Sequence, residues 1–298
     1  MGARARSGVL AALLLSGAVV FPGFGTIDGG GQLRFPGFGT IDGGGQHREH
    51  ERITRAALAC TADDSPGDCL RPRSIDQLAG HGNGFGAVGA PDRTEVAVPA
   101  AHCDDADYLT GDYPQTRDDA TVHLTDCVEH LRGRFREAVE RADELVDGHG
   151  RIVAAEVNLD GDCAFDTTRE ERAMCTTLES LGRALHGVQD FYSHSSWADE
   201  PDPTRPIGPA NPRGRVLNNF QKAVTAAVIE TRHQWAAFGD QLRREYGPRR
   251  AATMTCALTR DDPADDCARS GRTIAAPVLF VLLILASTAL RGRRRRRP

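Results

Sequence analysis

The chain has almost no lysine: Lys222 is the only one in 298 residues, and every other basic side chain that is always charged is an arginine. Eight of these arginines lie in the first 6 and the last 8 residues, and without them the formal net charge falls from −5 to about −13. Binding to nucleic acid depends on cationic side chains that neutralise phosphates. The body of the chain is therefore strongly acidic, and we expect no nucleic-acid partner.

The chain also lacks any Cys-x2-Cys pair, the spacing that is typical of thiolate zinc sites. Its eight cysteines are spread between residues 60 and 267. An even number of cysteines outside a membrane indicates disulfides, here four, formed in an oxidising compartment. The sequence leaves the pairing open. Neighbours in the sequence are favoured because each pair closes a local loop: Cys60 with Cys69, Cys103 with Cys127, Cys163 with Cys175, and Cys256 with Cys267.

Long apolar runs occur only at the two ends. Residues 9–20 follow two arginines, and we interpret residues 1–20 as a secretory signal peptide. Residues 274–290 are apolar and precede an arginine-rich tail, residues 291–298. As a helix this run spans about 26 Å, within the mismatch that a hydrocarbon core of about 30 Å tolerates. Since arginine-rich flanks stay in the cytoplasm, the sequence predicts a single-pass cell-membrane protein with a cytoplasmic C-terminus and an extracellular domain over residues 49–268.

A tandem repeat precedes that domain. Residues 21–34 and 35–48 are copies that differ only at Leu33 and His47. Two copies are too few for a solenoid, and glycine triplets do not pack a core. We interpret residues 21–48 as a flexible glycine-rich leader.

The rest of the chain shows helical periodicity and no convincing alternating strands. Apolar residues at steps of three and four predict long helices over residues 118–146, 169–196 and 216–246. Shorter helices are expected over residues 47–60, 74–78 and 251–258, and residues 61–116 are mostly loop. Asp160, Asp162 and Asp166 resemble part of a calcium loop but lack the EF-hand spacing and its terminal glutamate, which favours an ordinary acidic turn. The fold class is all-α, a multi-helix bundle, with one C-terminal transmembrane helix.

The most informative motif lies in the 169–196 helix. His186, Asp190 and His194 are four residues apart, so their side chains share one stripe beside an apolar face. Imidazole and carboxylate are ligands that zinc accepts. The two histidines are about 12 Å apart along the axis, too far to share one ion easily, and Asp190 between them can bridge two. The alternative is a partly solvated polar face without a metal.

Several strings of residues resemble the CinY and Het-C group of secreted proteins. They are the leader FPGFGTID and the stretches 50–54 (HERIT), 90–95 (APDRTE), 101–108 (AHCDDADY) and 189–197 (QDFYSHSSW), which together cover nearly the whole extracellular part. More distantly, the chain is similar to zinc-dependent phospholipase C and its nuclease relatives, which are helical and hold three zinc ions.

The phospholipase resemblance implies a set of ligands. By that similarity Asp92, His102, His186 and Asp190 hold one zinc ion, Asp190 and His50 hold a second, and Asp92 is a candidate catalytic base. His194 matches a ligand of the third ion, but the histidine and glutamate that complete that site are missing here, because the span from Asp199 to Gly214 has no histidine. We therefore expect two zinc ions, with His194 holding at most one weakly bound ion. His47 is a weaker candidate ligand, while His123 and His130 are interpreted as structural.

Two functions fit these observations. The first is an extracellular, membrane-anchored, zinc-dependent phosphoesterase with a phospholipase C-like activity on a phosphoester or lipid substrate. The alternative is a catalytically inactive, metal-stabilised binding protein at the cell surface, which the membrane anchor and the missing third-ion ligands favour.

Overall fold

The computed structural model describes residues 38–40, 42–43, 46–61, 67–82, 84–106, 116–166, 171–198 and 217–267, all within the unit formed by residues 34–298. The expected signal peptide, transmembrane helix and arginine-rich tail lie outside these residues. Among the described residues, no helix combines the length and hydropathy needed to cross a membrane.

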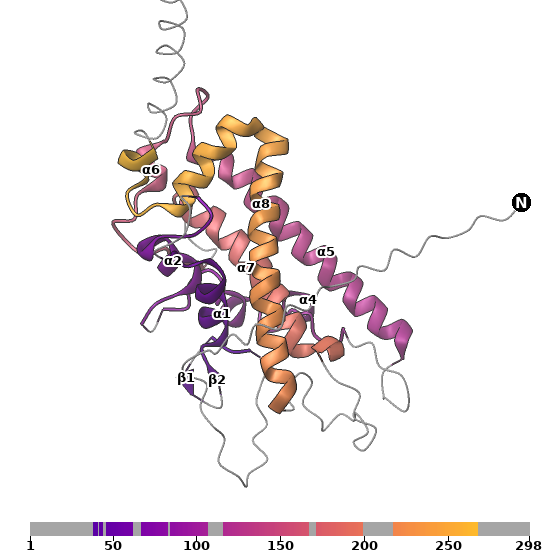
Figure 1. Ribbon diagram of the computed structural model, residues 1–298. Helices are drawn as coiled ribbons and strands as arrows, with labels where there is room; N and C mark the ends of the chain where they lie inside the picture. Colours follow the sequence, from indigo (N-terminus) through magenta and orange to yellow (C-terminus); the bar gives the residue numbers. More distant parts are fainter. Residues whose placement is uncertain are drawn as a thin grey trace, which may run out of the picture. The chain divides into compact units, whose positions relative to one another are not determined.

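The described part of the chain is mostly helical (Figure 1). A pair of two-residue antiparallel strands, β1 and β2, precedes the first helix. The long helices agree with the periodicity in the sequence to within a few residues, whereas α3 and α4 lie in a stretch that was expected to be loop. The elements are β1 (Asp42–Gly43), β2 (Gln46–His47), α1 (Glu49–Leu58), α2 (Pro72–Ala79), α3 (Pro91–Thr94), α4 (Pro99–His102), α5 (Arg117–Arg141), the 3-10 helix η1 (Ala142–Leu145), α6 (Ala154–Val157), α7 (Ala173–His194), the 3-10 helix η2 (Ser196–Ala198) and α8 (Leu217–Thr259).

Local sequence explains where several helices begin and break. The short helices α2, α3 and α4 each start with a proline, whose fixed φ and missing N–H suit the first helical position. α5 begins with a capping box in which Thr116 and Asp119 satisfy each other's backbone N–H groups. α8 is interrupted at Gly247, which has a positive φ of 77° and is followed by Pro248. The break falls between the two helices expected from the sequence, residues 216–246 and 251–258.

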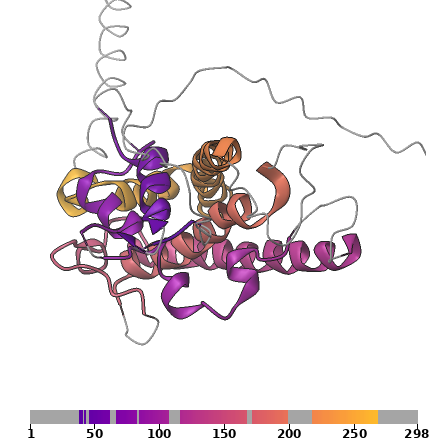
Figure 2. The ribbon, with the colours of Figure 1, turned by 90° about the horizontal axis from the view of Figure 1, so that it is seen from below.

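α7 is the central helix of the bundle. It packs mainly against α5 and α8, which lie on either side of it (Figures 1 and 2). Gly187 lets α4 and α5 come close to α7, because a Cβ at this position would lie 2.7 Å from the Ala101 carbonyl oxygen and 2.5 Å from Leu131. The apolar face of α7 is fully buried in the core, with Met174, Leu178, Leu181 and Leu185 at 0–1% exposure.

The described residues of the second repeat copy, 38–40, 42–43 and 46–48, belong to the folded domain, contrary to the expectation of a flexible leader, whereas the first copy lies outside the described residues. Phe38 is buried, and its backbone N–H donates to Ser193 Oγ of α7 at 2.7 Å. The N–H of Gly39 donates to the buried carboxylate of Glu49 at 3.0 Å. These contacts come from a phenylalanine and from backbone groups, which glycine content alone does not reveal.

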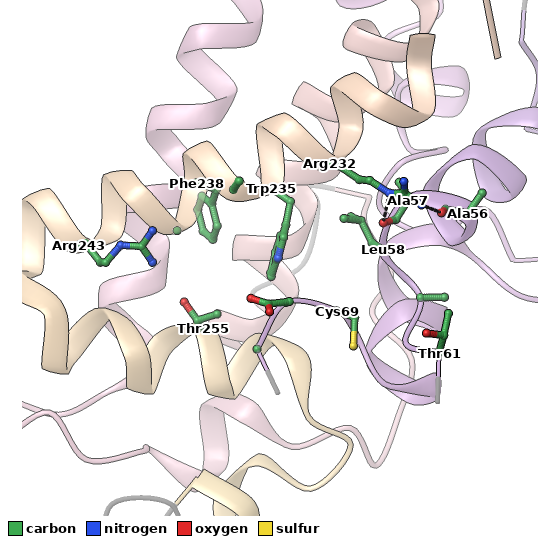
Figure 3. A pocket seen from close by; sticks show the side chains of 15 residues that line it. Ala56, Ala57, Leu58, Thr61, Cys69, Arg232, Trp235, Phe238, Arg243 and Thr255 are labelled. Atoms are coloured by element: carbon green, nitrogen blue, oxygen red, sulfur yellow. Dashed lines mark hydrogen bonds between the residues drawn. The ribbon is translucent and has the colours of Figure 1, made fainter. Parts of the chain in front are cut away.

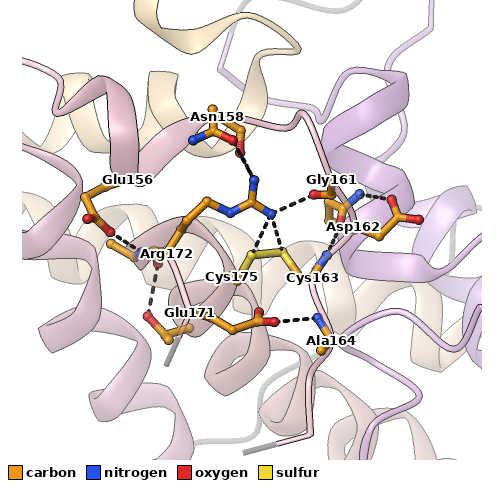
Figure 4. The surroundings of a disulfide bond; sticks show 12 residues. Glu156, Asn158, Gly161, Asp162, Cys163, Ala164, Glu171, Arg172 and Cys175 are labelled. Atoms are coloured by element: carbon orange, nitrogen blue, oxygen red, sulfur yellow. Dashed lines mark hydrogen bonds between the residues drawn. A yellow bond between two sulfur atoms is a disulfide. The ribbon is translucent and has the colours of Figure 1, made fainter. Parts of the chain in front are cut away.

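All eight cysteines form disulfides between sequence neighbours, as predicted: Cys60–Cys69, Cys103–Cys127, Cys163–Cys175 and Cys256–Cys267. Beside the third of these, the guanidinium of Arg172 donates to the carbonyl oxygens of Asn158 and Gly161 and to the Asn158 side chain (Figure 4). A cationic side chain therefore binds oxygens of the acidic turn, which agrees with an ordinary turn rather than a calcium loop.

A cavity of about 550 Å³ lies between the C-terminal end of α1 and the two halves of α8 (Figure 3). Trp235 and Phe238 form one wall, and Arg232 at its edge donates to the carbonyl oxygens of Ala56 and Ala57. None of the candidate metal ligands lines this cavity.

Candidate metal centre

The last three turns of α7 carry the motif that the sequence singles out. His186 and Asp190 are completely or almost completely buried, at 0% and 1% exposure, and His194 at the end of the helix is partly exposed. His186 lies one helical turn before Asp190 and His194 one turn after it, so the two histidines approach Asp190 from opposite directions along the helix.

Three other segments bring further candidate ligands to this stripe. α1 contributes His50, which is fully buried and whose ring stacks on that of His186 with a centroid distance of 4.2 Å. The first turn of α3 contributes Asp92, and the last residue of α4 is His102. All six residues predicted as metal ligands therefore meet in one cluster, although His50 and Asp190 are 140 residues apart in the chain.

The two carboxylate oxygens of Asp190 face different histidines. Oδ2 lies 2.9 Å from His186 Nε2 and 3.1 Å from His102 Nδ1. Asp92 Oδ1 lies 3.6 and 3.9 Å from the same two nitrogens. Oδ1 of Asp190 lies 3.3 Å from His50 Nε2 and 3.7 Å from His194 Nε2. The cluster thus has two halves that share Asp190.

The other nitrogen of each histidine is held by a hydrogen bond that orients the ring. Nδ1 of His186 donates to the Val88 carbonyl at 2.9 Å, and Nε2 of His102 donates to the Glu95 carbonyl at 3.3 Å. Nδ1 of His50 donates to the side-chain oxygen of Gln189 at 2.9 Å. Since a carbonyl oxygen can only accept, the neutral form of each ring points the lone pair of its remaining nitrogen toward Asp190, as in metal sites with a supporting outer shell.

In the neutral forms of these rings, acceptor nitrogens face the acceptor oxygens of the carboxylates, and either a proton, as at His50, or a bound cation removes this mismatch. His186 Nε2 and His102 Nδ1 are 2.9 Å apart, and both face a carboxylate oxygen. His50 Nε2 and Asp190 Oδ1 are buried atoms without a hydrogen-bond partner. Buried polar groups are rarely left unpaired, so these atoms fit a cation placed among them. Ligands of one tetrahedral ion with bonds of about 2.1 Å lie about 3.4 Å apart, which falls within the separations seen here.

The electrostatics keep Asp190 charged. Burial by itself raises the pKa of this carboxyl, but His186, His194 and His50 hold it well below the ordinary 3.8. Burial lowers the pKa of His50, yet Asp190 and Asp92 outweigh that effect and raise it to about 9. For His186 burial prevails, and its pKa is lowered. The cluster therefore offers ionised carboxylate for binding a cation, and protons compete with that cation at His50.

The other titratable candidates are not members of the cluster, although His130 is close enough to it that its pKa, which burial lowers, also responds to the charges of Glu95, Arg134 and His102. His47 is exposed and pairs with Asp42 at 3.4 Å rather than assisting His50. His123 and His130 are half-buried on α5. Cys163, Glu171 and Cys175 also come together, but both sulfurs are in a disulfide and are not thiolate ligands.

The sequence reasoning missed several residues that complete the cluster. Asp104 accepts from Nδ1 of His194 at 2.5 Å, and the hydroxyl of Thr40 donates to Asp92 Oδ2. The amide of Gln189 holds His50 on one side and donates to Thr54 and Thr231 on the other. The available signal was weak: Asp104 follows His102 by two residues, and Gln189 precedes Asp190.

No protein-family model, curated protein or solved structure matches this chain. The cluster itself is therefore the basis for assigning a function.

Proposed function

We propose that this domain is an extracellular zinc-dependent phosphoesterase of the phospholipase C kind that holds two ions. The observation that carries the proposal is the sharing of Asp190, whose two oxygens face two separate sets of imidazole nitrogens. Four disulfides support the location, because such bonds persist in oxidising compartments outside the cell. The membrane anchor predicted over residues 274–290 remains part of this proposal.

One half of the cluster is assigned to each ion. Asp92, His102, His186 and Asp190 hold the first ion, and His50, Asp190 and His194 hold the second. Imidazole and carboxylate without thiolate are ligands that suit zinc. From the sequence, His194 was expected to hold at most a third, weakly bound ion. We now assign it to the second ion, because its Nε2 faces the same Asp190 oxygen as His50 does.

Two zinc ions bound by these residues would supply Lewis-acid chemistry toward a phosphoryl group and would lower the pKa of a bound water. The protein supports this chemistry by keeping Asp190 ionised and the imidazoles in fixed orientations. Asp92 is the most exposed of the carboxylates assigned to the ions, with 28% of its side chain accessible. It is therefore our candidate for accepting a proton from the attacking water.

The test is metal analysis of the purified full-length chain, followed by hydrolysis assays with a chromogenic phosphodiester and a short-chain phosphatidylcholine. We expect about two zinc ions per chain and turnover that a chelator abolishes and zinc restores. Asp92→Asn should lower turnover at least about 100-fold, whereas Asp240→Asn, in an exposed ion pair with Arg243, should not. Absence of zinc, or zinc without turnover on either substrate, would contradict the phosphoesterase proposal.

A second function is favoured by the burial of the cluster. His50, His186 and Asp190 are at most 1% exposed, which is typical of a metal that stabilises a fold. A metal-stabilised surface binding protein would retain zinc, lose much of its thermal stability on chelation and show no turnover. The same experiment therefore separates the two functions.

A further inference from the structure

Arg183 is a buried arginine that the proposed chemistry does not use. Its side chain is only 2% exposed, yet each of its three nitrogens is hydrogen-bonded. Nε and Nη2 donate to Glu179 on its own helix at 3.1 and 2.6 Å. Nη1 donates to Glu95 Oε2 and to Thr94 Oγ1, both at 2.8 Å. Burying a guanidinium is costly unless it is fully paired, so this arrangement is a specific one.

The contacts of Arg183 join two segments that carry candidate ligands. Arg183 lies one turn before His186 on α7. Its partners Thr94 and Glu95 lie at the end of α3, two and three residues after Asp92. The guanidinium therefore ties the helix of His186 to the segment of Asp92.

Glu95 extends this link to a third ligand through its main chain. Its carbonyl oxygen accepts from Nε2 of His102 at 3.3 Å and from the N–H of Val98 at 2.8 Å. Its own N–H donates to the Pro91 carbonyl at 2.8 Å. The Glu95 side chain, which Arg183 holds, is thus one of the anchors of the carbonyl that orients His102, together with the backbone bonds to Val98 and Pro91.

Arg134 of α5 binds the other carboxylate oxygen of Glu95. Glu95 is consequently clamped between α5 and α7, and both arginines keep its carboxylate ionised, since the pKa of Glu95 is lowered although burial alone would raise it. Among the side chains that the structure describes, Arg183 is the one that connects this carboxylate to the helix that carries His186 and Asp190.

We infer that Arg183 is a positioning residue for the metal centre: through Glu95 it sets the orientation of His102 and the distance of His102 and Asp92 from His186. This inference rests on the proposed metal site but not on the turnover assigned to it. Supporting residues of this kind typically change metal affinity about 10- to 100-fold when they are removed.

The experiment compares Arg183→Met with Arg250→Met in the full-length chain. Arg250 is a matched control, because its partly buried guanidinium also joins distant segments, binding Asp143 and the Asp147 carbonyl, but contacts no residue of the cluster. Zinc affinity is measured by competition with a chromophoric chelator, and site geometry by the visible absorption of the Co²⁺-loaded protein. Both variants should lower the melting temperature.

Arg183→Met should weaken one of the two zinc ions about 10- to 100-fold and alter the cobalt spectrum, whereas Arg250→Met should leave both unchanged. Wild-type affinity and spectrum in Arg183→Met, or an equal loss in Arg250→Met, would overturn the inference.

If Arg183→Met does not fold, Glu95→Gln is used in its place. This variant keeps the shape of the side chain but removes its charge, and an unchanged zinc affinity in Glu95→Gln would likewise overturn the inference. Failure of the wild type to bind zinc overturns both proposals, whereas zinc binding without hydrolysis overturns only the phosphoesterase.

Discussion

His50 Nε2 and Asp190 Oδ1 lie 3.3 Å apart inside the protein, and neither atom has a hydrogen-bond partner. The opposite nitrogen of His50 is held by Gln189, so the ring cannot turn to satisfy Nε2 without giving up that bond. The second oxygen of Asp190 faces a different pair of histidines. One carboxylate therefore serves two sets of nitrogens, and its charge matters to both.

Asp190→Asn keeps the size of the side chain and removes the charge that offsets two cations. Because both sets of ligands share this residue, we expect about two zinc ions per wild-type chain and close to none in the variant. Elemental analysis of dialysed protein measures the difference. Unchanged zinc content in Asp190→Asn would show that the cluster does not bind zinc in the way proposed.

His194→Ala tests the assignment of the second ion. The motif alone suggests little effect, but the structure places Nε2 of His194 3.7 Å from the Asp190 oxygen that also faces His50. We expect the affinity for one ion to fall at least about 10-fold, with a smaller fall in Asp104→Asn, which removes the charge that orients the ring. His233→Ala on the exposed side of α8 is the control. If His194→Ala retained both ions with unchanged affinity, the assignment of His194 to the second ion would be wrong.

The Cys103–Cys127 disulfide is expected to couple to metal binding. Cys103 directly follows His102, and the bond attaches this end of α4 to α5. Replacing both cysteines with serine should cost about 3 kcal/mol of unfolding free energy and also reduce zinc affinity. Replacing Cys256 and Cys267, which close a loop at the end of α8, should reduce stability alone. Urea unfolding and zinc titration of the two double variants give the comparison, and equal zinc affinity in both would exclude the coupling.

We expect the ionisation of Glu95 to contribute to the pH dependence of the unfolding free energy. Its carboxyl has a pKa below the ordinary 4.5, because Arg134 and Arg183 outweigh the effect of burial. A lowered pKa in the folded state contributes stability that is complete above the ordinary value and is lost as the pH falls through the lowered one. In chelator-treated protein, the difference in unfolding free energy between wild type and Glu95→Gln should shrink as the pH falls from about 6 to 3. A difference that stays constant with pH would contradict this role of the charge.

The sequence by itself determined the features that depend on near neighbours. Apolar spacing predicted the long helices because one face of each is buried in the core. The four disulfides join sequence neighbours, as short loop closure favours. The spacing of His186, Asp190 and His194 placed them on one face because a helix repeats every 3.6 residues. The missing calcium-loop spacing at residues 158–166 likewise predicts an ordinary acidic turn.

Only the tertiary structure decided which atoms face one another. His50 and His102 reach Asp190 because α1 and α4 pack on α7, and the approach of α4 depends on the missing side chain of Gly187. The ligands expected for a phospholipase-like site did not say which Asp190 oxygen each one meets. The partners Val88, Glu95 and Asp104 hold the rings through contacts between distant segments, two of them through backbone carbonyls. Backbone carbonyls are the same in every residue, so no sequence pattern marks them, and only packing shows where they point.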